Sequence, residues 1–183
     1  MSKTGGGSWV CLALLGLVAC SSPAAPPAEG SAQVTWTNGC SLSPDSINGP
    51  GGIPSGMKVG ANQTVLDGRD GYKVSCSVVQ SGSKYSVSAS IEKPDEMTLT
   101  LDSSSISATG GPASMSFFSP GSINTWTSPT GGCTITTTST TEGLTVKPGS
   151  IWATYICPQV SDVNNLGKTC QTSGFVVFTG CSH

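Results

Sequence analysis

Residues 72–78 read Tyr-Lys-Val-Ser-Cys-Ser-Val, and residues 85–91 read Tyr-Ser-Val-Ser-Ala-Ser-Ile. In both stretches every second residue is apolar or aromatic, and the residues between them are polar. A period of two is typical of a strand with one buried face and one solvated face. The connection at 80–84 has the length of a hairpin loop and contains Gly82. These residues therefore predict an antiparallel hairpin.

Further strand-like segments lie on both sides of this hairpin. Residues 97–101 alternate in the same way, and residues 106–108 and 115–117 suggest another pair around a turn at Gly110-Gly111-Pro112. Together with the hairpin they predict a meander of five short strands. Shorter apolar or alternating segments occur at 33–37, 133–138, 144–146, 151–157 and 175–179.

Helix signals are almost absent, since only residues 159–166 could form one turn, with Ser161 or Asp162 as its cap. Several short strands separated by turn residues are typical of all-β domains. We therefore predict an all-β fold, either an antiparallel sandwich or a barrel-like meander, stapled by disulfides.

The amino-terminal residues predict export and lipidation. Lys3 precedes an apolar stretch at 9–19, which is too short for a membrane-spanning helix of about 20 residues and is typical of a signal peptide. It ends in Leu17-Val18-Ala19-Cys20, which resembles the lipobox of bacterial lipoproteins. The resemblance implies cleavage before Cys20, diacylglycerol on its sulfur and the membrane as a partner. The alternative is an ordinary secreted protein with a cysteine near its cleavage site.

The chain then divides into three parts. Residues 1–19 are the predicted signal peptide, and residues 20–31 are the lipidated cysteine and a flexible tether rich in Pro, Ala and Ser. Residues 32–183 form a single β domain. No Asp follows Cys20, which favours the outer membrane or the cell surface over the inner membrane within the bacterial cell envelope.

Six of the eight cysteines remain once Cys11, in the signal peptide, and Cys20 are set aside. An even number in an exported chain implies disulfides. Cys157 and Cys170 flank the loop of a predicted hairpin, which pairs them. Cys76 and Cys181 lie in phase with the apolar residues of their strands, which predicts Cys76–Cys181 and leaves Cys40–Cys133. A zinc site is the alternative, but CxxC spacing is missing and the single His is residue 183, so we expect no metal and no cofactor.

Charge and motifs argue against several functions. The net charge of −2 lacks the basic excess that nucleic-acid binding requires. His183 is terminal, no free thiol is expected, and Asp95 and Glu96 are adjacent after a proline, so we do not expect an enzyme. Residues 67–71 could suggest calcium, but the ligand pattern of an EF-hand is missing and a plain turn is favoured.

The leading prediction is a non-enzymatic binding or structural domain with a protein or glycan ligand. One alternative is a carrier that encloses an apolar ligand in a β-sandwich or barrel cavity. Another is a carbohydrate-binding surface module that uses Trp126 or Trp36. Trp126 lies among polar residues, where it either stacks on a sugar or covers the end of a core. The long Gly/Pro-rich stretch at 38–62 is a further place for a binding role.

A second resemblance concerns the layout of the mature domain. Over roughly residues 60–181, a tethered Ser/Thr/Gly-rich β domain with a cysteine in an early strand and another at the carboxyl end is similar to small mycobacterial lipoprotein antigens. It is also similar to uncharacterised exported lipoproteins of other bacteria. This chain carries four further cysteines.

Overall fold

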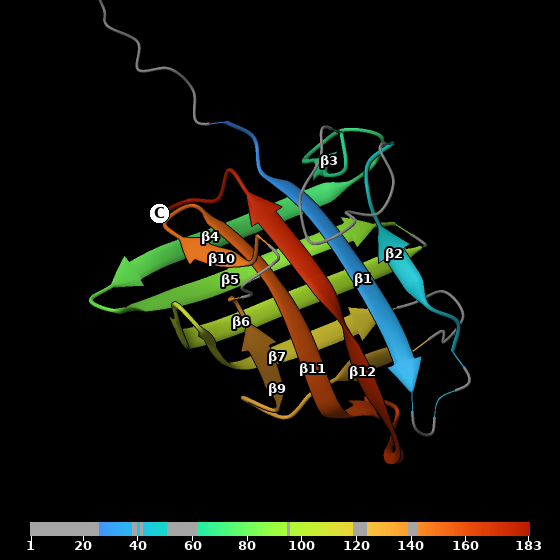
Figure 1. Ribbon diagram of the computed structural model, residues 1–183. Coiled ribbons are helices and arrows are strands. Elements are labelled where there is room, and N and C mark those ends of the chain that lie inside the picture. The colour runs from blue at the N-terminus through green and yellow to red at the C-terminus, as the bar shows by residue number, and fades with distance from the viewer. Residues whose placement is uncertain are drawn as a thin grey trace, which may run out of the picture.

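The computed structural model describes residues 26–37, 40, 42–50, 62–94, 96–118, 124–138 and 143–183. Within these ranges the fold is all-β with a barrel-like closure (Figure 1). The predicted signal peptide, Cys20 and residues 21–25 of the tether lie outside them. No helix in the described part of the chain is long and apolar enough to span a membrane.

One antiparallel sheet contains all the described strands. Its order is β2-β1-β12-β11-β8-β7-β6-β5-β4, with β9 pairing both β11 and β7, β10 pairing β11, and β3 pairing β1. The strands are β1 (Glu29–Thr37), β2 (Asp45–Ile47), β3 (Val65–Leu66), β4 (Lys73–Ser81), β5 (Lys84–Lys93), β6 (Met97–Ser107), β7 (Gly110–Phe118), β8 (Thr125–Thr127), β9 (Cys133–Thr136), β10 (Thr145–Lys147), β11 (Ser150–Asp162) and β12 (Asn165–Thr179).

The predicted hairpin is confirmed as β4 and β5. Val78 pairs with Val87 and Val74 with Ile91, and all four side chains are buried. The serines between them face outward, where the hydroxyls of Ser75 and Ser90 lie 2.8 Å apart. The alternation of apolar and polar residues therefore assigns the buried and solvated faces of these strands correctly.

The prediction of five short meander strands is wrong in its details. β6 runs without a break to Ser107, and the turn lies at Ala108–Thr109, so the meander has four longer strands, β4 to β7. The Gly110-Gly111-Pro112 segment is inside β7. Gly110 has a φ of 121°, and a β-carbon there would overlap the carbonyl oxygen of Ile135, so this glycine permits close strand approach rather than a turn.

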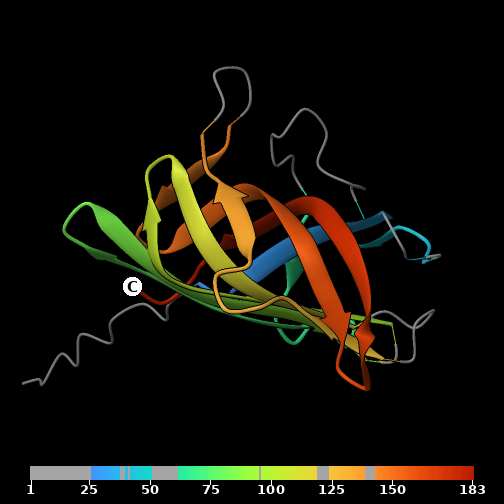
Figure 2. The ribbon, with the colours of Figure 1, turned by 90° about the horizontal axis from the view of Figure 1, so that it is seen from below.

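The sheet bends until its edge strand β4 meets the chain segments that precede β11 and follow β12. Figure 2 shows the green strands β4 to β6 on one side and the orange and red strands β10 to β12 on the other. The amide of Val78 donates to the carbonyl of Ser182 at 2.9 Å, and the amide of Ser182 donates to Cys76 at 3.0 Å. The amide of Gly149 also donates to Val78, at 3.1 Å. We call residues 76–78, 149 and 181–182 the closing seam.

Three disulfides link the sheet. Cys76–Cys181, predicted from strand phase, crosses the closing seam with a Cα–Cα distance of 4.7 Å. The predicted pairs Cys157–Cys170 and Cys40–Cys133 are wrong. The structure instead joins Cys40 to Cys170 and Cys133 to Cys157, with Cα–Cα distances of 5.4 and 4.1 Å.

Strand register explains this exchange of partners. Cys157 lies opposite Thr172 rather than Cys170, so the two cysteines of the β11–β12 hairpin do not face each other. Thr134 of β9 lies opposite Ile156, which brings the preceding Cys133 next to Cys157. The carboxyl end of β1 runs beside Gln171 of β12, which brings Cys40 to Cys170.

The predicted helical turn at 159–166 is also wrong. β11 continues as a strand to Asp162, and the chain reverses at Val163–Asn164. The buried carboxylate of Asp162 accepts a hydrogen bond from the amide of Asn164 at 2.8 Å and another from the side chain of Asn124 at 2.6 Å. Asp162 therefore stabilises a hairpin turn, as Asp and Asn commonly do.

The amino-terminal boundary of the folded domain lies three residues earlier than the sequence predicts. β1 begins at Glu29, so residues 29–31 belong to the sheet and not to the tether. Ser31 is fully buried, and its hydroxyl donates to the carbonyl of Ile47 in β2 at 3.0 Å. A small polar residue fits between strands when its hydroxyl has a partner, which composition alone does not reveal.

Tyr155 of β11 connects two strands inside the core. It is 1% exposed, and its hydroxyl donates to the carbonyl of Gln33 at 3.0 Å. It reaches across Gly174, where a β-carbon would overlap that same carbonyl oxygen. Burial raises the pKa of the Tyr155 hydroxyl well above its ordinary value of 10.0, against the smaller opposing effect of a hydrogen bond with Thr172.

This shift makes stability depend on pH in the alkaline range. The pKa of the Tyr155 hydroxyl is higher in the folded protein than in the unfolded chain, so the unfolded chain loses this proton first as the pH rises. The contribution of Tyr155 to the free energy of unfolding is therefore fully present below pH 10 and is lost progressively above it. We expect the free energy of unfolding, measured by urea titration, to fall by about 1.4 kcal/mol per pH unit above pH 10 because of this group. Tyr155→Phe should remove that slope and cost about 1 kcal/mol at pH 7. Equal slopes in both proteins would contradict the assignment, and Tyr85→Phe, at a half-buried tyrosine, is the matched control.

Candidate ligand-binding pocket

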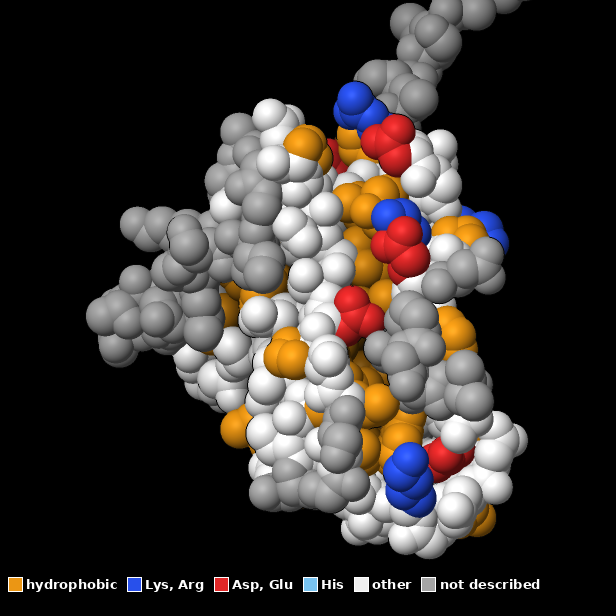
Figure 3. Space-filling model, turned by 90° about the vertical axis from the view of Figure 1, so that its right-hand side faces the viewer, with side chains coloured by type: hydrophobic (Ala, Val, Ile, Leu, Met, Phe, Trp, Pro, Cys, Tyr) orange, Lys and Arg blue, Asp and Glu red, His pale blue; other side chains and the backbone are white. Residues whose placement is uncertain are grey.

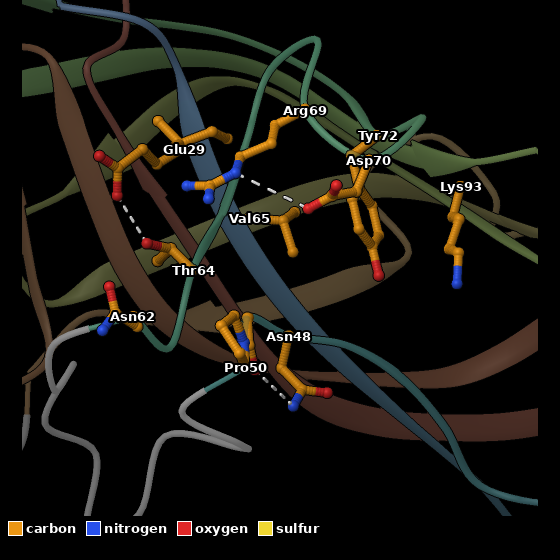
Figure 4. A pocket seen from close by; sticks show the side chains of 12 residues that line it. Glu29, Asn48, Pro50, Asn62, Thr64, Val65, Arg69, Asp70, Tyr72 and Lys93 are labelled. Carbon is orange, nitrogen blue, oxygen red and sulfur yellow. Dashed lines mark hydrogen bonds and ion pairs between the residues drawn. The ribbon is translucent and has the colours of Figure 1, made fainter.

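A cavity of about 800 Å³ lies beside β3, where β1 begins and β5 ends (Figure 4). Its volume falls in the range of about 300–1,000 Å³ that is typical of small-molecule sites. We call it the β3 pocket. Its lining includes the side chains of Glu29, Thr64, Arg69, Asp70, Tyr72 and Lys93.

A tight turn at 67–72 forms one wall of the β3 pocket. The predicted turn is confirmed, with φ values of 74° at Gly68, 53° at Asp70 and 80° at Gly71. The carboxylate of Asp67 accepts a hydrogen bond from the amide of Val74 at 2.9 Å. The backbone amide of Asp67 donates to the carbonyl of Ala28 at 2.9 Å. Asp67 thus ties the turn to the start of the sheet.

The polar groups of the pocket form short-range pairs. The hydroxyl of Thr64 donates to the carboxylate of Glu29 at 2.6 Å, which joins β3 to the first residue of β1. The guanidinium of Arg69 lies 3.7 Å from the carboxylate of Asp70, and both side chains are largely exposed, at 71% and 79%. Exposed pairs of this kind contribute little to stability, so both groups remain available to a ligand.

Lys93 at the end of β5 is held on the opposite side. Its ammonium lies 2.6 Å from the carboxylate of Glu96 and 5.4 Å from the centre of the Tyr72 ring. The hydrogen bond to Glu96 raises the pKa of Lys93 above its ordinary value of 10.5, against the smaller effect of desolvation. The ammonium is therefore fully protonated at neutral pH.

The described lining is balanced in charge, with two cations and two carboxylates. Figure 3 shows the side of the molecule on which cationic and acidic side chains lie next to one another, surrounded by uncharged and apolar groups. The described lining residues include hydrogen-bond donors and acceptors. The arrangement is suited to recognition of a polar molecule.

The two tryptophans predicted as ligand contacts lie in the core. Trp126 belongs to β8 rather than to a loop and is 1% exposed, and Trp36 of β1 is 7% exposed. Their ring centres are 5.9 Å apart, and Lys168 lies over Trp126 at 5.4 Å. Neither ring presents a face to an external sugar, so the core alternative for Trp126 describes it correctly and the ligand-contact interpretation is wrong for both residues.

A second, smaller hollow of about 390 Å³ lies over β5, β6 and β7. Half of its lining residues are serines, and some of their hydroxyls have partners. Ser88 donates to Asp102 at 2.7 Å, and Ser103 donates to the carbonyl of Pro112 at 2.6 Å.

The residues considered above for a metal site or for catalysis, where they are described, lie apart from the β3 pocket or pair locally. Among the described residues, no group of three or more His, Cys, Asp or Glu side chains could hold a metal ion. His183 lies at the chain end, with its Nδ1 3.3 Å from the carbonyl oxygen of Cys181. Glu96 pairs with Lys93, whereas Cys20 and Asp95 lie outside the described residues.

Sequence reasoning missed the β3 pocket because its residues come from four separate segments. Glu29 was assigned to the tether, Thr64 follows the long Gly/Pro-rich stretch, and Lys93 was interpreted as a strand end. Only the turn at 67–71 gave a local signal. When the whole chain is compared with known protein families, curated proteins and solved structures, no match is found.

Proposed function

We propose that this protein is a lipid-anchored domain of a bacterial cell envelope that binds a polar ligand in the β3 pocket and does not catalyse a reaction. The observation that carries the proposal is the position of the pocket. Glu29, the first residue of β1, is both a lining residue and the point at which the chain from Cys20 enters the sheet.

This position keeps the pocket close to the anchor. Glu29 lies nine positions after Cys20, and a Pro-rich segment extends by about 3.1 Å per residue, which gives a reach of roughly 28 Å. The turn between β11 and β12 lies at the opposite end of the barrel-like sheet (Figure 1). A lipid on Cys20 would therefore keep Glu29, at the edge of the β3 pocket, within roughly 28 Å of the membrane surface.

The alternative of an apolar carrier is less well supported. The interior between the strands is filled by large buried side chains, including Trp126, Tyr155, Phe117 and Phe178. A carrier of an apolar ligand needs an apolar cavity there. The larger of the two hollows described above is instead lined by charged and polar groups at the surface, which favours a polar ligand.

The mass of the intact, unreduced protein from its native membranes tests the anchor. We expect the mass of residues 20–183 plus a diacylglycerol and an amide-linked acyl chain, less the hydrogens lost in three disulfides. The matched variant, Cys20→Ala, should be neither lipidated nor cleaved by the lipoprotein signal peptidase. An unlipidated wild-type mass would sink the anchor and leave a freely secreted domain.

A further inference from the structure

We infer that the β3 pocket binds a neutral saccharide. The inference rests on the proposed function, because it names the ligand class of the same site. It follows from three properties of the described lining, namely its charge balance, its mixture of donors and acceptors, and its apolar centre.

The charge balance disfavours ligands with a net charge. An anion placed among Arg69 and Lys93 would also lie beside the carboxylates of Glu29 and Asp70. A cation would be attracted by the carboxylates and repelled by the two basic groups. A neutral ligand avoids both unfavourable terms and leaves the existing pairs Arg69–Asp70 and Lys93–Glu96 intact.

The hydrogen-bonding groups are suited to hydroxyls. The guanidinium of Arg69 only donates and the carboxylate of Glu29 only accepts, whereas the amides of Asn48 and Asn62 do both. A hydroxyl donates and accepts at the same time. Neighbouring hydroxyls on one sugar ring can therefore satisfy both kinds of group within a single pocket.

The centre of the pocket supplies an apolar contact. Val65 of β3 lines the pocket but is only 6% exposed, so most of the apolar surface comes from the half-buried Leu66 and Tyr72 and from the exposed Pro50 on the segment that follows β2. Figure 4 shows Val65 with the polar side chains of Glu29, Thr64, Arg69 and Asp70 around it. A sugar ring carries C–H groups on its faces and hydroxyls on its edge, which matches an apolar centre within a polar rim.

The test is a titration of the full mature domain with neutral di- to tetrasaccharides of hexoses and pentoses, followed by calorimetry and amide NMR. We expect one or more of them to shift the amides of Thr64, Arg69 and Tyr72. Arg69→Met and Glu29→Gln should each weaken binding by about tenfold or more, since each removes a hydrogen bond to a charged group. Lys73→Met and Asp102→Asn, which change charges outside the pocket, are the matched controls and should leave the affinity unchanged.

Salt dependence separates the ligand classes. Binding of a neutral saccharide should change by less than about twofold between 0.05 and 0.5 M salt, because screening acts on charged partners. If a zwitterionic dipeptide or inorganic phosphate shifted the same amides and no saccharide did, the saccharide proposal would be overturned. The proposal that the β3 pocket is a ligand-binding site would then still stand. A flat response of these amides to all three probe classes would overturn both the saccharide and the proposed ligand site.

Discussion

The double substitution Cys76→Ala with Cys181→Ala is expected to lower the free energy of unfolding by about 4–5 kcal/mol. The disulfide joins residues 105 apart in the sequence, and closing a loop of this length in the unfolded chain accounts for that magnitude in the chain-entropy model. Urea unfolding of the oxidised proteins measures it. The same change should also expose the closing seam, since the bond lies beside the hydrogen bonds between Val78 and Ser182.

A matched variant separates the two effects. Cys40→Ala with Cys170→Ala removes a bond between residues 130 apart, so the entropic loss should be similar. The Cys40–Cys170 bond lies near the amino-terminal end of β12, away from the closing seam. In the variant that lacks this bond, hydrogen exchange at Val78 and Gly149 should therefore occur only through global unfolding. In the seam variant these amides should exchange by local opening, well ahead of the core amides. Identical exchange patterns in the two variants would contradict a role for Cys76–Cys181 in closing the sheet.

Trp126→Ala is expected to cost about 3–5 kcal/mol of unfolding free energy. The ring is 1% exposed and contacts Trp36 in the core, so its removal leaves a cavity that the surrounding strands cannot fill. Chemical denaturation measures the loss. Leu166→Ala, at a side chain that is 74% exposed, is the surface control and should change stability by less than about 0.5 kcal/mol.

The milder substitution Trp126→Phe distinguishes the core from a ligand site. It keeps most of the apolar volume, so the domain should remain folded and bind the same saccharides with unchanged affinity. If Trp126→Ala proved nearly neutral for stability while Trp126→Phe abolished binding, the ring would be a ligand contact and its placement in the core would be wrong.

The local part of the fold follows from the sequence, because a strand with one buried face alternates with a period of two. Residues 72–78 and 85–91 satisfy this rule, and the structure buries the side chains of Val74, Val78, Val87, Ala89 and Ile91. The same rule underestimates the length of the longest strands, β11 and β12, because their ends do not alternate between apolar and polar residues. β11 ends in polar residues, and the tip of the β11–β12 hairpin contains Asn164, Asn165 and Gly167, which are typical of a loop.

Contacts between distant segments could not be obtained in this way. The pairing of Cys40 with Cys170 depends on the register between β1 and β12, and that of Cys133 with Cys157 on the register between β9 and β11. The single correct pair, Cys76–Cys181, followed from the phase of both cysteines on apolar strand faces. The burial of Trp126 likewise depends on β8 joining β7 and β11, which the polar residues around it do not indicate.

The β3 pocket illustrates the same limit at the level of a site. Glu29, Thr64, Arg69 and Lys93 share no motif and no spacing, and they meet because β3 pairs with the first residues of β1 while the turn at 67–72 bonds back to Ala28. A site assembled by sheet topology becomes visible only when the strand order is known.

The closing seam also determines when, during synthesis of the chain, the sheet can close. Its partners are residues 76–78 and residues 181–182, so a chain that emerges amino end first holds one half of the seam long before the other half exists. The sheet can close only after residues 181–182 have left the ribosome or a translocation channel. Until then the closing seam stays open, and oxidation of Cys76 with Cys181 marks the point at which both of its halves are present.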